Sequence, residues 1–90
     1  MSQAIVQPEE LRRFALTLKK FNNDLMERTT SLAAQLDSLG QTWRDQEHRR
    51  FEEEFTNHAR SLARFVELNE QYVAFLLRKA ERIDEYLRQR

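Results

Sequence analysis

The sequence predicts an all-α fold: an antiparallel hairpin of two helices that dimerises into a four-helix bundle. The chain of 90 residues contains one Gly and one Pro, too few for the tight turns that a β-sheet fold of this length needs. Leucines recur at seven-residue intervals along its first half, and 33% of all residues are charged. Such a pattern is typical of long helices with one apolar face. A chain of this length forms a single domain, here over residues 1–90.

The first helix is expected over residues 8–39. Pro8 suits the first position of a helix because its fixed backbone angle is helical and its missing N–H would have no partner there. Glu9 and Glu10 then place negative charge at the positive end of the helix. The repeating leucines are Leu11, Leu18, Leu25, Leu32 and Leu39, and Phe14 and Phe21 add a second position of the repeat. These spacings put the side chains on one face of a helix.

The turn is expected over residues 40–42. Gly40 suits the left-handed conformation that often follows a helix end. Thr42 is a candidate N-cap of the next helix, with Asp45 three positions further on. So short a connection implies that the two helices lie side by side and run antiparallel.

The second helix is expected over residues 43–87. Its apolar residues occupy about three positions in every seven, a wider face than one neighbouring helix covers. Across both helices, the expected core consists of Leu11, Phe14, Leu18, Phe21, Leu25, Leu32, Leu36, Phe55, Leu62, Phe65, Tyr72, Leu76 and Ile83. Between residues 68 and 77 the apolar side chains point to more than one side, so this segment is expected to bind a second chain. The expected dimer interface comprises Leu68, Tyr72, Phe75, Leu76 and Leu77.

Composition excludes several classes of function. Lys and Arg number 15, as do Asp and Glu, so the formal net charge is zero and no nucleic-acid partner is expected. No run of about 18 apolar residues is present, so no membrane insertion is expected. The first seven residues lack a basic start and a long apolar core, so they are not expected to form a signal peptide. The absence of Cys excludes disulfides and thiolate metal sites.

No residue pattern indicates an enzyme, a cofactor or a metal site. His48 and His58 are the only histidines, and neither follows a Glu by three positions as in the carboxylate-rich metal sites of helix bundles. The serines are scattered, without the Gly-rich elbow that exposes a nucleophile. We therefore expect no catalytic residues, no cofactor and no metal ligands.

Trp43, in the connection between the helices, has two interpretations. As a staple it would cover Leu36, Leu39 and Phe51 at the tip of the hairpin. As an anchor it would be exposed to a partner, as Trp often is at the centre of interfaces. Both roles are compatible with the sequence.

The turn resembles that of a known family. Trp43-Arg44-Asp45 stands at the turn, and Phe51 and Phe55 follow in the next helix. This arrangement resembles the WXG family, small helical-hairpin proteins associated with type VII secretion, in which a Trp-x-Gly turn precedes apolar or aromatic residues. Asp45 stands where the family has Gly. The resemblance implies a dimer of antiparallel hairpins, and it implies that these five residues form a partner-binding turn motif.

The resemblance implies a non-enzymatic protein–protein interaction module, either a type VII secretion substrate or its chaperone-like partner. A homodimer is the expected assembly, and a heterodimer of related hairpins is the alternative. The family's export signal is a Tyr followed four residues later by Asp or Glu, whereas here Tyr72 is followed by Leu76 and Tyr86 by Arg90. The expected location is the cytoplasm, with secretion as the alternative. A different function is that of an intracellular coiled-coil adaptor, structural or regulatory, unconnected with secretion.

Overall fold

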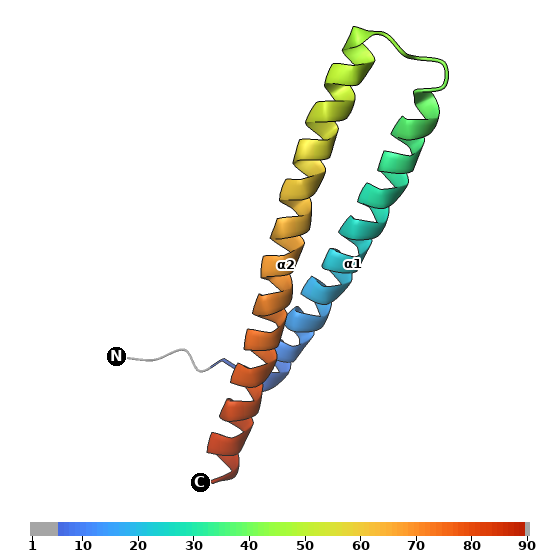
Figure 1. Cartoon of the computed structure of the whole chain (residues 1–90). Helices are drawn as coiled ribbons and strands as arrows, with labels where there is room; N and C mark the ends of the chain where they lie inside the picture. The colour runs from blue at the N-terminus through green and yellow to red at the C-terminus, as the bar shows by residue number, and fades with distance from the viewer. Residues whose placement is uncertain (1–5, 90) are drawn as a thin grey trace.

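The protein is a hairpin of two long helices. The computed structural model describes residues 6–89, with α1 over Pro8–Leu39 and α2 over Gln46–Arg88. The helices run antiparallel and side by side, with Pro8 and Arg88 at the end opposite the turn (Figure 1). The rod measures 68 × 23 × 17 Å. The all-α hairpin predicted from the sequence is therefore confirmed.

Residues 1–5 and 90 lie outside the description. The expectation that the chain does not start with a signal peptide falls largely on these residues. Over the described residues, neither helix combines the length and the apolar character needed to cross a membrane.

Gly40 follows the end of α1 and has right-handed helical backbone angles, with φ −64° and ψ −11°. The sequence-based prediction of a left-handed conformation at Gly40 was therefore wrong. No residue of the described chain has a positive φ. The Gly40 N–H donates to the carbonyl oxygens of Leu36 and Asp37, so a tightened last turn closes the helix. The position is close-packed, because a Cβ atom here would lie 3.0 Å from Cε1 of His48 and would have to displace that ring slightly.

The helix α2 begins three residues later than predicted, because Asp45 and not Thr42 is its N-cap. The Asp45 Oδ1 atom accepts a hydrogen bond of 3.0 Å from the backbone N–H of His48, which satisfies one of the unpaired donors at the start of the helix. The N–H of Thr42 donates instead to the Leu39 carbonyl oxygen, at 3.2 Å. This bond keeps Thr42 in the turn that closes α1, so the connection is longer than predicted.

The two helices touch along one line of side chains, which we call the contact line. Its apolar side chains that are buried are Ala15, Leu36, Val73 and Ala80, and its buried polar residues are Asn22, His48 and Asn69. The line comprises, at spacings of three, four or seven, Leu11, Ala15, Leu18, Asn22, Leu25, Thr29 and Leu36 of α1 and His48, Glu52, Phe55, Ala59, Leu62, Val66, Asn69, Val73, Leu76, Ala80 and Ile83 of α2. This alternation is the packing pattern of two supercoiled helices.

The predicted core was wrong at five positions. Leu36 is buried, and the half-buried members of the predicted set are Leu11, Leu18, Leu25, Phe55, Leu62, Leu76 and Ile83. The exposed members are Phe14, Phe21, Leu32, Phe65 and Tyr72. The reason is geometric: two helices cover each other along a single line, so an apolar face wider than that line stays on the surface.

A polar cluster interrupts the contact line near its middle. The Asn69 Nδ2 atom donates to Asn22 Oδ1 at 3.0 Å, and Asn22 Nδ2 donates to Glu70 Oε2 at 2.8 Å. Asn22 is fully buried and Asn69 is 7% exposed. A buried amide costs free energy when it loses its partner. The pairing of the two helices that sets Asn22 opposite Asn69 is therefore favoured over pairings that leave either amide against an apolar side chain.

Replacing one partner of this cluster should destabilise the hairpin. We expect Asn22→Ala to lower the free energy of unfolding by about 1–3 kcal/mol, because the Asn69 amide is left buried without its acceptor. The double variant Asn22→Leu with Asn69→Leu should lose much less, since no polar group remains unpaired. Urea unfolding followed by circular dichroism measures both, with the exposed Asn23→Ala as the matched control. Equal losses in the single and the double variant would contradict the assignment.

Candidate partner-binding surface

On α1, two large apolar residues each directly precede a residue of the contact line in the sequence. Phe14 precedes the buried Ala15, and Phe21 precedes the buried Asn22. One residue turns a helix by roughly 100°, so these rings flank the contact line and do not enter it. Phe14 is 57% exposed and Phe21 is 48% exposed.

The same one-residue offset recurs on α2. Four consecutive positions of the contact line are each preceded by an exposed apolar side chain, and these are Phe65, Leu68, Tyr72 and Phe75. Both helices are right-handed and they run antiparallel. The residues that directly precede contact-line residues therefore point to the same side of the hairpin on both helices. The exposed rows of the two helices therefore lie on one side.

A cleft of about 400 Å³ continues this side at the turn. Leu32, Gln35, Leu36 and Leu39 of α1 and Phe51 and Phe55 of α2 line it. We call the whole surface the apolar strip, and its members, each 45–59% exposed, are Phe14, Phe21, Leu32, Leu39, Phe51, Phe65, Leu68, Tyr72 and Phe75. Exposed apolar surface of this extent is typical of a protein-binding site.

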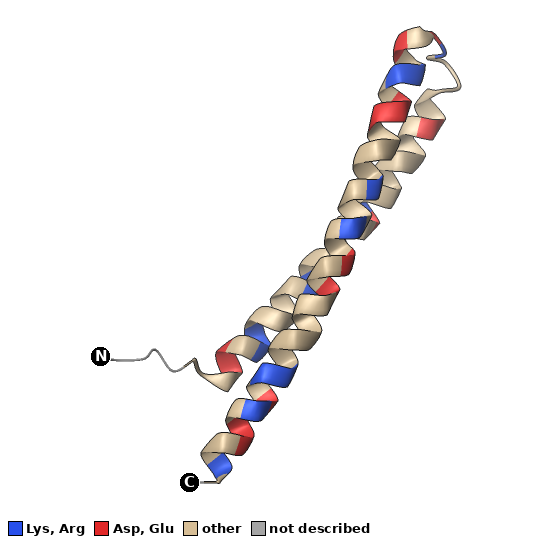
Figure 2. Cartoon of the chain, turned by 60° about the vertical axis from the view of Figure 1, so that its left-hand side comes forward, with Lys and Arg blue, Asp and Glu red and all other residues tan. Residues whose placement is uncertain are grey.

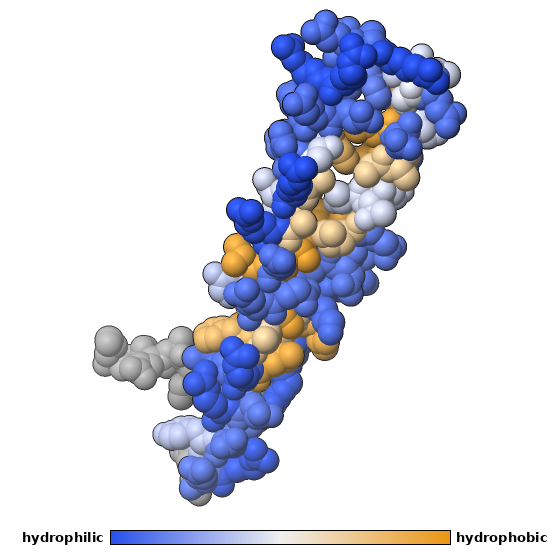
Figure 3. Space-filling model, viewed as in Figure 1, coloured by the Kyte–Doolittle hydropathy of each residue, from blue (hydrophilic) through white to orange (hydrophobic). Residues whose placement is uncertain are grey.

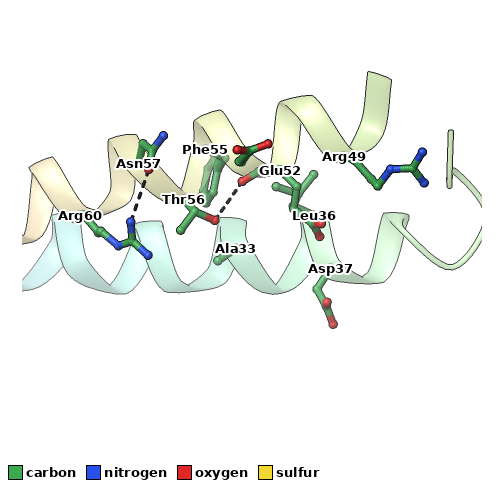
Figure 4. A pocket seen from close by; sticks show the side chains of 10 residues that line it. Ala33, Leu36, Asp37, Arg49, Glu52, Phe55, Thr56, Asn57 and Arg60 are labelled. Atoms are coloured by element: carbon green, nitrogen blue, oxygen red, sulfur yellow. Dashed lines mark hydrogen bonds between the residues drawn. The ribbon is translucent and has the colours of Figure 1, made fainter. Parts of the chain in front are cut away.

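The opposite side of the hairpin, which we call the polar side, carries fewer exposed apolar side chains. A groove of about 650 Å³ lies there near the turn, lined mainly by charged and hydroxyl side chains (Figure 4). Within it, the Thr56 hydroxyl donates to the Glu52 carbonyl oxygen at 2.9 Å. Leu36 and Phe55 border both this groove and the apolar cleft. Near the turn, a single layer of side chains therefore separates the apolar cleft from the polar groove.

Charge is mixed over the surface. Basic and acidic residues are interspersed along both helices (Figure 2). In the view of Figure 3, hydrophilic residues cover most of the visible face, and apolar residues form a broken band along the rod. Mixed charges attract a partner weakly in water, so the apolar strip is the surface with the larger free energy to gain from burial.

The five residues expected at a dimer interface do not share one surface. Leu68, Tyr72 and Phe75 lie on the apolar strip. Leu76 is half-buried on the contact line. Leu77 follows the contact line by one residue and is 42% exposed, so it lies on the polar side. The α1 rings of the strip were assigned to the core by sequence reasoning, although their one-residue offset from Ala15 and Asn22 was visible in the sequence.

The turn places Trp43 against the start of α2. The half-buried indole meets the His48 ring edge-on, with centroids 4.8 Å apart and planes at 71°. Its centroid lies 6.4 Å from that of Phe51. The Arg44 Nε atom donates to the Gly40 carbonyl oxygen at 3.2 Å. These contacts fit the staple role for Trp43, with His48 as a partner that sequence reasoning missed.

The carboxyl group of Asp45 accepts a hydrogen bond at the start of α2. The pKa of its carboxyl lies below the ordinary value, chiefly because the His48 backbone N–H donates to it, with smaller contributions from the Trp43 side chain and the Glu47 N–H. Partial desolvation acts in the opposite direction. At the start of α2 the chain thus has an acid that accepts hydrogen bonds from backbone amides of the first helical turn.

His48 is the buried polar residue of the turn. It is 5% exposed, and its Nε2 atom has no hydrogen-bond partner among the described residues. His58 lies exposed on α2. Within residues 6–89, no group of three or more His, Cys, Asp and Glu side chains is arranged to hold a metal ion.

Comparisons with known proteins agree with this architecture. Residues 3–86 match the WXG100 family, described as proteins of 100 residues with WXG. The chain is similar to the crystal structure of a glycine-to-alanine mutant of the secreted protein EsxB from Bacillus anthracis strain Sterne, with a TM-score of 0.80. That match has 23% sequence identity and covers 93% of this chain and 97% of the other, and it shows a shared fold. No curated protein matches the chain.

The charge of Asp45 should make part of the stability depend on pH. Because the pKa of Asp45 is lowered in the folded state, its carboxylate stabilises the fold above the ordinary Asp pKa of about 3.9, and this contribution is lost as the pH falls through the lowered pKa. Asp45→Asn keeps an oxygen acceptor but removes the charge. The wild type should therefore melt at a higher temperature than Asp45→Asn near neutral pH.

The difference in melting temperature between the two proteins should shrink on acidification. Thermal unfolding across this pH range measures it, with the exposed Asp24→Asn as a matched control away from the turn. A difference that does not change with pH would contradict a role for the carboxylate charge.

Proposed function

The chain belongs to the WXG100 family, and from this premise we propose that it is a non-enzymatic protein–protein interaction module of type VII secretion, acting as a secretion substrate or as its chaperone-like partner. The observation that carries the proposal is the apolar strip. Its nine large side chains are about half exposed along one side of the hairpin. Burial of such a surface against another protein is the largest favourable contribution that this molecule has to offer.

A second hairpin is the partner that fits the charge pattern of α2. Residues 44–54 contain five acids and three bases, and residues 78–90 contain five bases and three acids. In an antiparallel dimer the acidic end of one copy faces the basic end of the other, which favours that orientation. We infer a homodimer that forms a four-helix bundle, and a heterodimer with a related hairpin is the alternative assembly.

The turn motif extends the strip to the tip of the hairpin. Phe51 and Phe55 line the apolar cleft, and Trp43 lies next to Phe51. Arg44 and Asp45 follow Trp43 in the sequence, carry opposite charges and are exposed. A rigid aromatic beside accessible polar groups is the usual composition of an interaction hot spot, which supports partner binding by Trp43, Arg44, Asp45, Phe51 and Phe55.

A protein-binding role also accounts for the hollows of the surface. The apolar cleft and the polar groove are open depressions along the rod, between the two helices near the turn. Residence in the cytoplasm followed by export fits a secretion substrate, whereas a chaperone-like partner remains with its substrate. The second candidate function, an intracellular coiled-coil adaptor, is favoured by one observation: Leu76 and Arg90 occupy the positions where the Tyr-based export signal has an acid.

A charge on the apolar strip should abolish dimerisation. We expect Phe21→Glu to raise the dissociation constant on the order of a hundredfold, because an unpaired carboxylate would be buried in the interface. Light scattering should then give the monomer mass of 10.9 kDa in place of twice that value. The control is Leu16→Glu, since Leu16 is more exposed than Phe21 but follows the contact line and so lies on the polar side. Loss of the dimer in the control alone would contradict the assigned surface.

Export separates the two candidate functions. In cells with an active type VII apparatus, we expect the native protein in the culture medium, either alone or together with its partner. Fractionation of cells with and without the secretion ATPase measures this, with a cytoplasmic enzyme as the marker of lysis. Retention of all the protein in cells that export other family members would favour the intracellular adaptor.

A further inference from the structure

Two exposed leucines lie on the polar side of the hairpin, away from the apolar strip. Leu16 directly follows the buried Ala15 on α1, and Leu77 directly follows Leu76 of the contact line on α2. Leu16 is 66% exposed and Leu77 is 42% exposed. A second hairpin that covers the strip leaves both leucines in water, so the proposed function does not account for them.

Two polar contacts between the helices bracket this part of the polar side. The Arg12 guanidinium forms an ion pair with Asp84, and the Asn22 Nδ2 atom donates to Glu70 Oε2 at 2.8 Å. Arg12, Asp84 and Glu70 each directly follow a residue of the contact line, so both contacts cross between the helices on the polar side. The interval between them spans about 15 Å along α1.

The two leucines lie at nearly the same level within this interval. Leu16 is four residues from the ion pair and six residues from the amide contact, and Leu77 is seven residues from each. The exposed Ala74, which directly follows the buried Val73, stands one turn from Leu77. We call the surface formed by Leu16, Ala74 and Leu77 the open-end patch, because it lies toward the end of the hairpin opposite the turn.

The two edges of the open-end patch carry opposite charges. On α1, the exposed Lys19 stands three residues after Leu16 and directly follows a residue of the contact line. The residues three and four positions from Lys19 include no acid, so no acid of its own helix is placed to pair with it. On α2, the exposed Glu81 stands four residues after Leu77 and also directly follows the contact line. The patch is thus bordered by a base on one helix and by an acid on the other.

A single helix is the partner shape that fits this surface. Two helices packed side by side leave a shallow groove, and the side chains of a third helix form a ridge that fills such a groove. An extended peptide binds through unpaired backbone groups, whereas the backbone groups of α1 and α2 are paired within each helix. The polar side of a second copy is itself a groove, so two such sides do not interlock. The acids beside the patch disfavour an anionic membrane surface.

We propose that the open-end patch binds one amphipathic helix of a different protein. The apolar stripe of that helix covers Leu16 and Leu77. Its acidic edge lies over Lys19, and its basic edge lies over Glu81. The interval between the two polar contacts accommodates roughly two to three turns of the bound helix. The inference goes beyond the proposed function, because it assigns a second partner to the side that the first partner leaves free.

A synthetic helical peptide of about 12 residues tests the patch. It carries leucines at three- and four-residue spacing, Glu along one edge of the leucine stripe and Lys along the other. Binding of the dye-labelled peptide to the full chain is measured by fluorescence anisotropy. We expect Leu16→Ser and Leu77→Ser each to weaken binding by at least about tenfold, because each removes an apolar contact at the centre of the interface.

The matched control is Met26→Ser. Met26 is 36% exposed and also directly follows the contact line, but it lies beyond Asn22, outside the bracketed interval. This substitution should leave the affinity for the peptide unchanged. Circular dichroism of each variant verifies that the helices are intact. Equal affinity of the wild type, Leu16→Ser and Leu77→Ser for the peptide would overturn the proposal.

A change of charge tests the edges of the patch. The wild type should prefer the peptide with one acidic and one basic edge to a peptide with Lys along both edges. Lys19→Glu makes both edges of the patch acidic, so this variant should prefer the second peptide, with each affinity changing by about threefold. The comparison does not depend on the direction in which the peptide lies. The same order of preference in both proteins would contradict the assigned edges.

Three further outcomes separate this inference from its competitors and from the proposed function. A mass above that of the dimer in light scattering, lost in Leu16→Ser, would make a second copy the occupant and overturn the proposal. Binding to phosphatidylserine vesicles that Leu16→Ser abolishes would make a membrane the occupant and also overturn it. A monomeric wild-type chain that still binds the peptide through Leu16 and Leu77 would overturn the homodimer of the proposed function and support the open-end patch.

Discussion

Two helices cover each other along a single line, and the rest of this molecule follows from that constraint. The contact line takes small and β-branched side chains at its most buried points, such as Ala15, Val73 and Ala80, because these allow the two backbones to approach closely. The large rings stand one residue away and remain on the surface. The Asn22–Asn69 pair then fixes the register, because a slide by one heptad would set a buried amide against leucine or alanine.

The turn is built on one small residue and one acid. No residue of the described chain uses a positive φ, so the turn does not need the conformational freedom of glycine. At Asp45 the chain has extended backbone at the cap and a carboxylate that accepts the His48 N–H. His48 in turn fills the space left open by Gly40 and supports the Trp43 ring. The glycine of the turn thus serves close packing, and the acid serves the helix start.

The hairpin could be predicted from sequence because its signals are local. Pro8 marks a helix start, and the seven-residue repeat marks the apolar face. The face of each helix that contacts the other could not be predicted from the repeat alone. The positions of Phe14 and Ala15 repeat with the same seven-residue period, and they differ only by the rotation of one residue about the helix axis. Asn22 and Asn69 become recognisable as a pair only once the register is known. Thr42 and Asp45 are both suitable caps, and the choice between them depends on where the chain reverses.

The small amount of apolar surface buried along the contact line makes the stability of the fold depend on partner binding. Of the apolar side chains buried in the described hairpin, two are alanines, which contribute little area, and at the turn the line is only one side chain thick. The apolar strip contains more large apolar side chains than the buried positions of the contact line do. A second protein on the strip would therefore supply much of the burial that stabilises an ordinary core, and by mass action the stability of the fold would rise with the concentration of that partner. For this chain, the surface that recognises a partner and the apolar surface that completes its core are the same residues.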